Sequence, residues 1–595
     1  MTQISPDSSG SAHNSSPLSD GVLAAASALL LLLYLIVAYG RGFFALPAFD
    51  YRLDKVTHLL FIPPEQLSSM FWKITLLFPA ACGIAVLLTR AGIRTTFWES
   101  PATKWRIALS VVVMLAVVAT FALVVLQRTE VTDDEIVYTF QAKTLLQGRL
   151  TNPPPPGKEN FDNVFMINDG TQWIGHYNGG HPLWLALGMV LGSPYVTTFL
   201  SSALLVLLVF LIGRQLFGDP RVGFLASSLL IVSPFFTMTC ASLLSHSTAA
   251  VMLSIFVLAF LSGMEGQDLT LKRIAAGLVA GLALGYGFNI RPLTAMAFAA
   301  PFGLSVILSG RMRERRMLAW LASVTAGFAV VFGLTLLWNR AITGHALLFP
   351  IPYLDAGQSV GLGVQDHTLA KGFSNLAVNI ARLNAFAFGF PISLLFVAVT
   401  LFIKWRRADW LLWGILASLS VAYLFWWSAG VADLGPVYYF EAMIPIALLT
   451  AHGVFSLTAS VTHRWPQMKY VAYNFLLVNI VLSILIFTPE RIGHLRALTS
   501  QIREPYELMR QEGVDNAVVF VSSLPLKGWV FGYRTASPTL DDSIIMCRFL
   551  KRQNNDRVLQ AFPDRTYYVL RYNPEWVRSE LRRVTAGELL AISPQ

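Results

Sequence analysis

Three consecutive carboxylates, Asp133, Asp134 and Glu135, form the first group of side chains in the sequence that could carry acid–base chemistry. They follow a long apolar run and head a segment with apolar residues at helical spacing. One interpretation is an acidic first turn of a helix, which the helix dipole stabilises by about 0.3–1 kcal/mol per charge. The other is a general base, because partial burial raises the pKa of a carboxyl group toward neutral pH. The motif is too short to decide between these two interpretations.

Histidine and arginine side chains supply a second set of candidates. The segment WIGHYNGGHPLW (173–184) contains His176 and His181, and His181 begins a predicted helix whose backbone N–H groups favour an anion. Histidines in such places also serve as plain hydrogen-bonded interfacial residues. His246 and Arg291 each stand alone between two apolar runs, where an unpaired charge is costly. Arg291 could simply extend to the membrane surface, whereas a neutral His246 could ligate a metal or donate to phosphate oxygens.

These side chains must be positioned by membrane-spanning elements. The chain has 595 residues, of which 55% are hydrophobic and 13% are charged, and its mean hydropathy is +0.57. Soluble chains are about one quarter charged. About 20 apolar residues cross a bilayer, and the sequence contains about 13 runs of this kind. The composition therefore predicts a polytopic α-helical membrane protein, and it excludes a soluble enzyme, a disordered chain and a coiled coil.

Basic residues set the predicted orientation. The chain has 44 Lys and Arg against 34 Asp and Glu, a net charge of +10, and most of the excess lies in short loops between apolar runs. Every second loop is basic, which places these loops in the cytoplasm. This topology accounts for the charge, so no nucleic-acid partner is expected. The six basic clusters are Arg90/Arg94/Lys104/Arg106, Arg214/Arg221, Lys272/Arg273, Arg311/Arg313/Arg315/Arg316, Lys404/Arg406/Arg407 and Arg464/Lys469.

The same alternation divides the chain into regions. Residues 1–20, rich in Ser, Asn and Pro, are predicted to be a disordered tail, and 21–489 form the transmembrane domain. Residues 490–595 contain β-type apolar runs and are predicted to fold as a small extracytoplasmic α/β domain. The segment 182–192 is too short to span and is predicted to be an interfacial helix. The larger loops predicted to face outside are 127–195 and 339–385, with 240–246 and 428–440 as shorter outer hinges.

Polar side chains gather on the outer face in this topology, although chance would place about half of them on the cytoplasmic side. The motif GPVYYFE (435–441) puts Tyr438, Tyr439 and Glu441 at the outer mouth of a span. The other members are Asp133, Asp134, Glu135, His176, His181, His246, Arg291, Arg340, Asp366, His367 and Arg382.

On these motifs the chain resembles the GT-C superfamily of glycosyltransferases, polytopic enzymes that use polyprenyl-phosphate sugars, such as protein O-mannosyltransferases and bacterial aminoarabinose transferases. The resemblance covers about 107–460. It rests on the carboxylates at 134–135 with downstream Tyr138, and on the motifs YNGGHPLWLALG (177–188), LIGRQLFGDPRVGFLASSLLIVSPFF (211–236), NIRPLTA (289–295), WNRAITGHALLFPIPY (338–353) and GPVYYFEAMIP (435–445).

The resemblance implies a GT-C-like fold and a catalytic carboxylate in the first large outer loop. It assigns this role to Asp134, with Asp133 and Glu135 as further candidates, and it implies that the phosphate of the donor is bound by His181, Arg291 and Arg340. Substrate contacts are expected from His176, Tyr177, Tyr438, Tyr439 and Glu441. The family often has an acidic residue where this chain has His246, which is therefore a candidate metal ligand. The family pattern Gly-Pro-Arg-Tyr-Tyr is Gly-Pro-Val-Tyr-Tyr here, so one phosphate-binding arginine is missing.

The predicted activity is transfer of a hexose or pentose, with inversion, from a polyprenyl-phosphate donor to a hydroxyl of a lipid, glycan or protein acceptor. The predicted location is the plasma (inner) membrane, with the active site on the extracytoplasmic or periplasmic face and a divalent Mg, Mn or Zn ion as an optional cofactor. Two other classes remain open: a transporter or lipid flippase, and a non-catalytic assembly factor. Transporters often show inverted repeats with ionisable groups near the membrane midplane, and neither feature is evident in this sequence.

Overall fold

A computed structural model describes residues 17–40, 69–265, 268, 270–430, 433–523, 536–573 and 578–593. The first described helix, α1 (Pro17–Gly40), begins inside the tail predicted for 1–20, and residues 1–16 of that tail lie outside the described residues. The long apolar helices that follow are α3 (Phe78–Arg90), α4 (Lys104–Thr120), α7 (Tyr195–Phe217), α10 (His246–Glu265), α11 (Leu271–Ile290), α13 (Arg315–Thr343), α18 (Met443–Thr462) and α19 (Met468–Leu482).

Several of these spans are extended by π-helical turns. The turns are η2 (Lys73–Leu77) before α3, η3 (Phe121–Val125) after α4, and η10 (Ser483–Phe487), which joins α19 to α20 (Thr488–Gln511). The continuous helix from Met468 to Gln511, apolar in its first half, therefore passes through the boundary predicted at 489/490. The last membrane helix therefore continues directly into α20, the helix that leads to the C-terminal unit.

Nine helices of the described residues are long and apolar enough to cross a membrane, or up to ten if one bent pair counts as a span. That pair is α8 (Pro220–Val232) and α9 (Pro234–Ala241), which meet at 66°. The break occurs at Ser233, whose hydroxyl caps α9 while Pro234 occupies its first turn. The predicted count of about 13 is not confirmed. The runs that form shorter helices are α12 (Pro292–Leu308), α16 (Leu395–Val399) with η8 (Thr400–Phe402), and α17 (Arg407–Tyr423).

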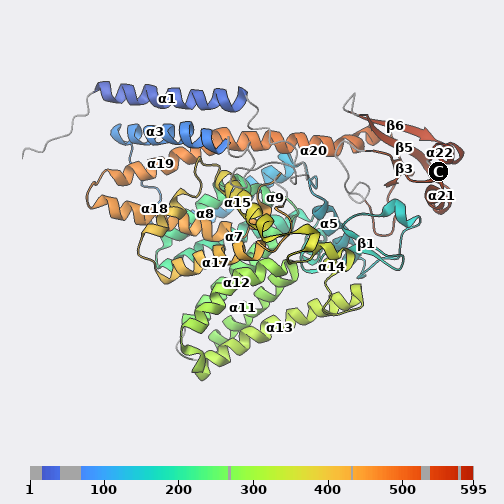
Figure 1. The fold of residues 1–595 in the computed structure, drawn as a ribbon, viewed down its shortest axis with the longest axis horizontal. Helices are drawn as coiled ribbons and strands as arrows, with labels where there is room; N and C mark the ends of the chain where they lie inside the picture. Colours follow the sequence, from blue (N-terminus) through green and yellow to red (C-terminus); the bar gives the residue numbers. More distant parts are fainter. Residues whose placement is uncertain are drawn as a thin grey trace, which may run out of the picture.

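The six basic loops meet at one end of the bundle, as the alternation of Lys and Arg predicts. In Figure 1 this end includes the connection between α18 and α19, which lies away from the C-terminal sheet. Each basic loop contacts at least one other, so all six share one side. The contacts are Arg106 with Phe224, Lys469 with Glu99, Arg221 with Phe455, Gln215 with Ser262, Arg316 with Asp268, and Met264 with both Arg311 and Arg407.

The first large loop lies at the opposite end and contains its own elements. They are α5 (Asp133–Leu146), η4 (Lys158–Phe161), a hairpin of β1 (Met166–Asn168) and β2 (Trp173–Gly175), and α6 (Gly180–Val190), which is the short helix predicted at 182–192. The second loop lies beside it, since Gln172 donates to Ile342 O (2.8 Å). Its elements are α14 (Pro350–Leu354), η6 (Ala356–Gln358), η7 (Val364–Asp366) and α15 (Leu369–Phe386).

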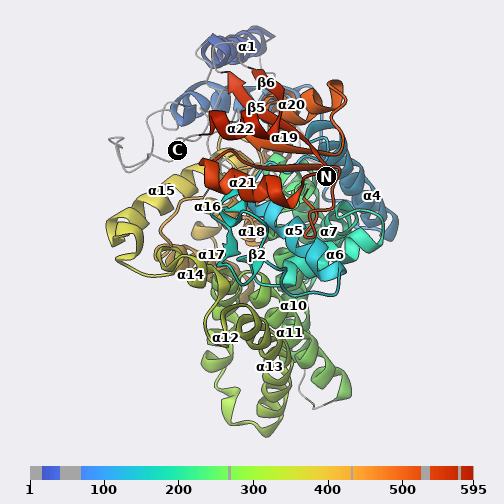
Figure 2. The same cartoon turned by 90° about the vertical axis from the view of Figure 1, so that its right-hand side faces the viewer.

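The C-terminal unit is a four-stranded sheet among the described residues, in the order β4-β3-β5-β6. Strands β3 (Ala517–Val521), β4 (Ile544–Arg548) and β5 (Thr566–Asn573) are parallel, and β6 (Arg578–Val584) pairs antiparallel with β5. Helices α21 (Arg552–Ala561) and α22 (Ala586–Ile592) complete it. Figure 2 faces this unit, with α5 and β2 behind its helices. Short helices elsewhere are η5 (Arg311–Arg313) and η9 (Val437–Tyr439).

One hydrophobic core joins this unit to the first large loop. Side chains from one face of α5, Ile136, Val137 and Phe140, are buried with Val518 and Phe520 of β3. Asn160 adds hydrogen bonds from η4 to the C-terminal unit. Because α5 packs directly on the sheet, the first loop and this sheet lie on the same side of the membrane.

This arrangement predicts the outcome of cysteine labelling. In a background without native cysteines, Lys371→Cys and Glu580→Cys should react with an impermeant maleimide in intact spheroplasts, because both residues are exposed at the end opposite the basic loops. Arg313→Cys, equally exposed in a basic loop, is the matched control and should label only after lysis. Labelling of Arg313→Cys in intact spheroplasts would invert the orientation.

Candidate active site

At the N-terminus of α5, the adjacent carboxylates of Asp134 and Glu135 lie in different surroundings. Thr132 caps the helix by accepting the Glu135 N–H at 3.4 Å, and Glu135 Oε2 accepts the Thr132 N–H at 2.9 Å. This capping box turns Glu135 into the interior, where it is fully buried. Asp134, one position earlier on the helix, stays partly exposed.

Asp134 is bound by a tyrosine from the connection between β2 and α6. Tyr177 donates its hydroxyl to Asp134 Oδ1 at 2.5 Å. Gln141, two turns further along α5, holds this tyrosine in place by donating to Tyr177 O at 2.8 Å. Burial and the nearby Asp134 charge raise the pKa of Tyr177 well above its usual value, so the phenol keeps its proton and remains a donor.

Aromatic rings connect Asp134 to the start of α6. The ring of Tyr138, one turn after Asp134, lies 4.4 Å from the ring of Tyr177 and 4.7 Å from that of His181. The Tyr138 hydroxyl donates to Ser245 Oγ at 3.2 Å, between α9 and α10. Side chains far apart in the sequence thus form one cluster around Asp134.

Arg291 brings a positive charge to this cluster. It ends α11 and precedes Pro292, so the chain turns there and the side chain projects from the hinge. The guanidinium donates to Ser245 Oγ (3.3 Å) and to the Tyr423 hydroxyl (3.5 Å), and it lies 5.8 Å from the Tyr438 ring. Its side chain is 17% exposed, so a ligand can reach it.

Glu441 joins Arg291 to His246. Its Oε1 lies 3.7 Å from Arg291 Nε and 3.3 Å from His246 Nδ1, and the carboxylate is fully buried. The predicted metal ligand therefore has an acidic hydrogen-bond partner. Among the residues that the structure describes, no group of three or more His, Cys, Asp and Glu side chains could hold a metal ion. A metal remains an optional cofactor, and His246 and Glu441 are a contacting pair that falls short of such a group.

His181 does not have the position predicted for a phosphate-binding cation. Both of its ring nitrogens already have partners: Nε2 lies 2.8 Å from Leu243 O and Nδ1 lies 3.1 Å from Thr248 Oγ1. Burial lowers the pKa of His181 to about 4, so the ring is neutral at physiological pH. Its place in the cluster is structural, because a neutral and fully paired ring cannot offer a charge to phosphate.

Glu135 likewise differs from the prediction of a catalytic candidate. Its two oxygens accept hydrogen bonds from Leu243 N, Val131 N, and both the backbone and the hydroxyl of Thr132. Burial raises the pKa of Glu135 to about 7 despite these donors. Asp133, beside Asp134 in the first turn of α5, is partly exposed.

Four predicted site residues remain: Tyr438, Tyr439, Arg340 and His176. Tyr438 belongs to the cluster, since its ring stacks on that of Tyr423 at 5.5 Å, and Tyr439 packs on Tyr423 at 5.4 Å. Arg340 is exposed at the end of α13, and no hydrogen bond within the described residues ties it to the cluster. His176 is buried against Phe165 and Tyr177, which lie 5.1 and 4.4 Å away, and burial lowers its pKa to about 3.

Sequence reasoning missed Ser245 and Tyr423 as members of the cluster. Ser245 is adjacent to His246, so the outer hinge 240–246 was a usable signal. Tyr423 lies near the end of the apolar helix α17 and gave no signal of this kind, because a tyrosine there is typical of a membrane interface.

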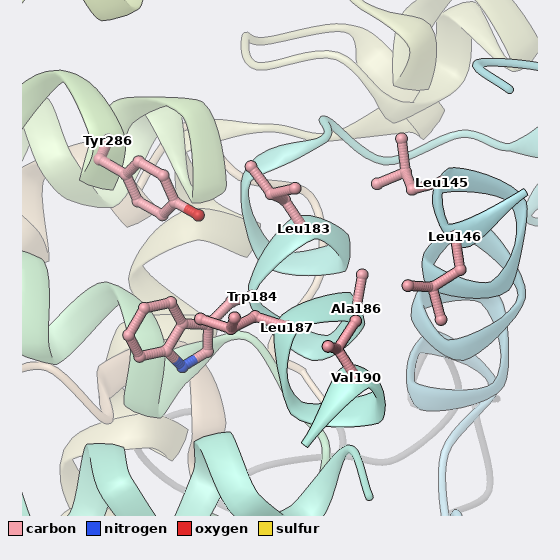
Figure 3. A pocket seen from close by; sticks show the side chains of 8 residues that line it. All are labelled: Leu145, Leu146, Leu183, Trp184, Ala186, Leu187, Val190 and Tyr286. Carbon is pink, nitrogen blue, oxygen red and sulfur yellow. The ribbon is translucent and has the colours of Figure 1, made fainter. Parts of the chain in front are cut away.

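An apolar groove runs beside the cluster between α5, α6 and α11. Figure 3 shows α6 in the middle, with Leu145 and Leu146 of α5 on one side and Tyr286 of α11 on the other. The groove has a volume of about 430 Å³. The Tyr286 hydroxyl is already bound to Gly180 O, at the start of α6. The lining is therefore almost wholly hydrocarbon, and the remaining residues are Leu183, Trp184, Ala186, Leu187 and Val190.

Residues 184–338 match a family model described as dolichyl-phosphate-mannose-protein mannosyltransferase. The matched region contains His246 and Arg291 but neither Asp134 nor Glu441, and it is less than half of the chain. It supports the resemblance to GT-C superfamily membrane glycosyltransferases that the sequence motifs indicate. A comparison with curated proteins finds no match.

Among solved structures, ArnT from Cupriavidus metallidurans bound to undecaprenyl phosphate is similar, with 13% identity and a TM-score of 0.49, covering 83% of this chain and 100% of that one. The apo Archaeoglobus fulgidus oligosaccharyltransferase has 13% identity and a TM-score of 0.46, covering 80% and 70% of the two chains. Mycobacterial arabinofuranosyltransferase AftD has 14% identity and a TM-score of 0.40, covering 80% and 35%.

Proposed function

We propose that the chain is a glycosyltransferase that moves a sugar from a polyprenyl-phosphate-linked donor to an acceptor hydroxyl on the extracytoplasmic face of the inner membrane, with inversion. The observation that carries this proposal is the partly exposed Asp134 carboxylate, hydrogen-bonded to Tyr177 in the same cluster as the Arg291 guanidinium. A base and a cation in one cluster at the membrane surface suit transfer from a lipid phosphate.

In the proposed reaction, Asp134 accepts the proton of the acceptor hydroxyl as its oxygen attacks the anomeric carbon. The bond between that carbon and the phosphate oxygen breaks, and its electron pair leaves with the polyprenyl phosphate. Arg291 stabilises the charge that develops on the phosphate, because its guanidinium is partly exposed and fixed by Ser245 and Glu441. Tyr177 keeps the Asp134 carboxylate oriented toward the acceptor.

The apolar groove supplies a place for the hydrocarbon chain of the donor. It begins where Tyr286 binds Gly180, directly before His181 and the polar cluster. A lipid with its phosphate at Arg291 would need apolar surface close by, against which its chain can pack in place of other lipid chains. The groove meets that need without polar atoms that lack partners.

This assignment predicts the effect of filling the groove. Leu187 is 47% exposed and lines the groove, so Leu187→Trp should fold and occupy part of it. We expect KM for a long-chain polyprenyl donor to rise about tenfold, which corresponds to about 1.4 kcal/mol of lost binding. A donor with a short isoprenoid chain should be nearly unaffected. Leu191→Trp is the matched control, because Leu191 is 60% exposed but lies outside the lining. Equal effects of both variants on both donors would exclude the groove.

The proposal as a whole is tested by incubating the purified protein in detergent with a panel of labelled polyprenyl-phosphate sugars and candidate acceptors. We expect at least one donor to bind by native mass spectrometry and its sugar to be transferred. A transporter or an assembly factor would leave every donor chemically intact.

A further inference from the structure

We propose that Glu135 is a positioning residue, a proposal that rests on the proposed function. Its carboxylate ties the helix that carries Asp134 to the hinge between α9 and α10. Through Leu243 of that hinge, it also fixes the orientation of His181. The capping box alone needs only Oε2. The other oxygen, Oε1, accepts the Leu243 N–H at 2.7 Å, from a residue 108 positions further along the chain.

The hinge passes this contact on to α6. The carbonyl of the same residue, Leu243, lies 2.8 Å from His181 Nε2. A carbonyl oxygen can only accept, so Nε2 carries the proton and Nδ1 accepts from the Thr248 hydroxyl at 3.1 Å. One residue of the hinge therefore holds the N-terminus of α5 through its N–H and the N-terminus of α6 through its C=O.

The contacts close a ring that begins and ends on adjacent residues of α5. From His181 the ring continues through the edge-on contact with Tyr138 (4.7 Å) and the Tyr138–Tyr177 contact (4.4 Å). It returns to α5 at the hydrogen bond between Tyr177 and Asp134. A change in the position of Leu243 would thus move the rings that orient the proposed base.

The same hinge also contacts the proposed phosphate-binding residue. Ser245, two positions after Leu243, accepts from both Tyr138 and Arg291. Ser245 and Leu243 are both buried, so the hinge has no solvent to replace a lost partner. Glu135 is the acidic group that holds this hinge from the α5 side.

Glu135→Gln tests the proposal, because glutamine has one acceptor oxygen where the carboxylate has two. The amide must give up either the Leu243 N–H or the donors of Val131 and Thr132. We expect kcat to fall about 10–100-fold, while KM for the donor stays within about twofold. The matched control is Thr132→Val, which removes the hydroxyl from the capping box and leaves the Leu243 contact in place.

A second measurement follows His181 directly and needs no substrate. In protein with ¹⁵N-labelled histidine, the His181 signal, assigned by its loss in His181→Gln, should show a neutral ring protonated at Nε2. We expect this signal to shift or broaden in Glu135→Gln and to be unchanged in Thr132→Val. An unchanged His181 signal in Glu135→Gln, or the same change in Thr132→Val, would overturn the proposal. If the protein transferred no sugar, the proposed function would be refuted. The spectroscopic result would still decide whether Glu135 fixes the orientation of His181.

Discussion

Replacing Asp134 with asparagine should lower the turnover of a polyprenyl-phosphate sugar by about 10²–10⁴-fold, the usual contribution of a general base. Asparagine keeps the shape of the side chain, and its oxygen can still accept from Tyr177. It cannot take the proton of the acceptor hydroxyl at this position. Expression, melting temperature and donor binding should therefore stay close to those of the wild type, and initial rates in one detergent preparation measure the loss.

Asp133→Asn is the matched control for this prediction. It removes an equal charge from the neighbouring position of the same helical turn, where Asp133 is also partly exposed. We expect a milder loss, because Tyr177 orients Asp134 rather than Asp133. If Asp134→Asn kept more than about a tenth of the wild-type rate, the loss would be too small for removal of a general base.

Arg291→Gln should produce the second large effect. Losing one preorganised donor to a developing negative charge costs about 10²–10³-fold in kcat. Arg291→Lys should recover part of this loss, since lysine restores the charge but cannot reach Ser245 and Tyr423 together as the planar guanidinium does. Both kcat and the affinity for the donor are the quantities to measure.

Two controls separate catalysis from folding in this case. Removing Arg291 leaves the buried Glu441 beside His246 without that cation. The double variant Arg291→Gln/Glu441→Gln restores the balance of charge and should melt closer to the wild type. It should remain as inactive as the single variant. Arg340→Gln removes an exposed arginine that the sequence motif also marked, and we expect little change. A loss in Arg340→Gln as large as in Arg291→Gln would shift the phosphate site to α13.

The membrane-spanning helices were predictable because long apolar runs carry a strong signal. The alternation of basic residues placed the six basic loops on one side, and the contacts of Arg106 with Phe224, of Lys469 with Glu99, and of Arg311 and Arg407 with Met264 agree. Strands β3 and β5 were also visible in the sequence, since both are continuous apolar or aromatic runs. Strand β6 was not, because RSELRRV carries charges on its exposed face and resembles a polar helix.

Where prediction failed, local geometry and long-range partners decided the outcome. The run at 222–239 reads as one span, but Ser233 and Pro234 end one helix and start another inside it. In the run at 386–403, Gly389 adopts a positive φ of 67° before Pro391, and the helix does not continue. These few residues do not lower the average hydropathy of a long run enough to interrupt it, so hydropathy alone gives no sign of either break.

The candidate site was predictable as a set of residue types and not as a set of partners. Asp134 was marked as part of a run of three carboxylates after an apolar run, and Arg291 by its isolation between two such runs. The structure brings both into one cluster. The neutral state of His181 and the pairing of His246 with Glu441 depend on contacts 62 and 195 residues apart. Sequence spacing carries no information about such contacts.

The most direct test of the central claim is the product balance of a single reaction, measured with purified protein, one labelled polyprenyl-phosphate sugar and an acceptor. For the wild type, we expect polyprenyl phosphate and glycosylated acceptor to be released in equal amounts, and Asp134→Asn should form neither at an appreciable rate. Intact donor recovered in full from the wild type, or equal product formation by Asp134→Asn, would contradict the account.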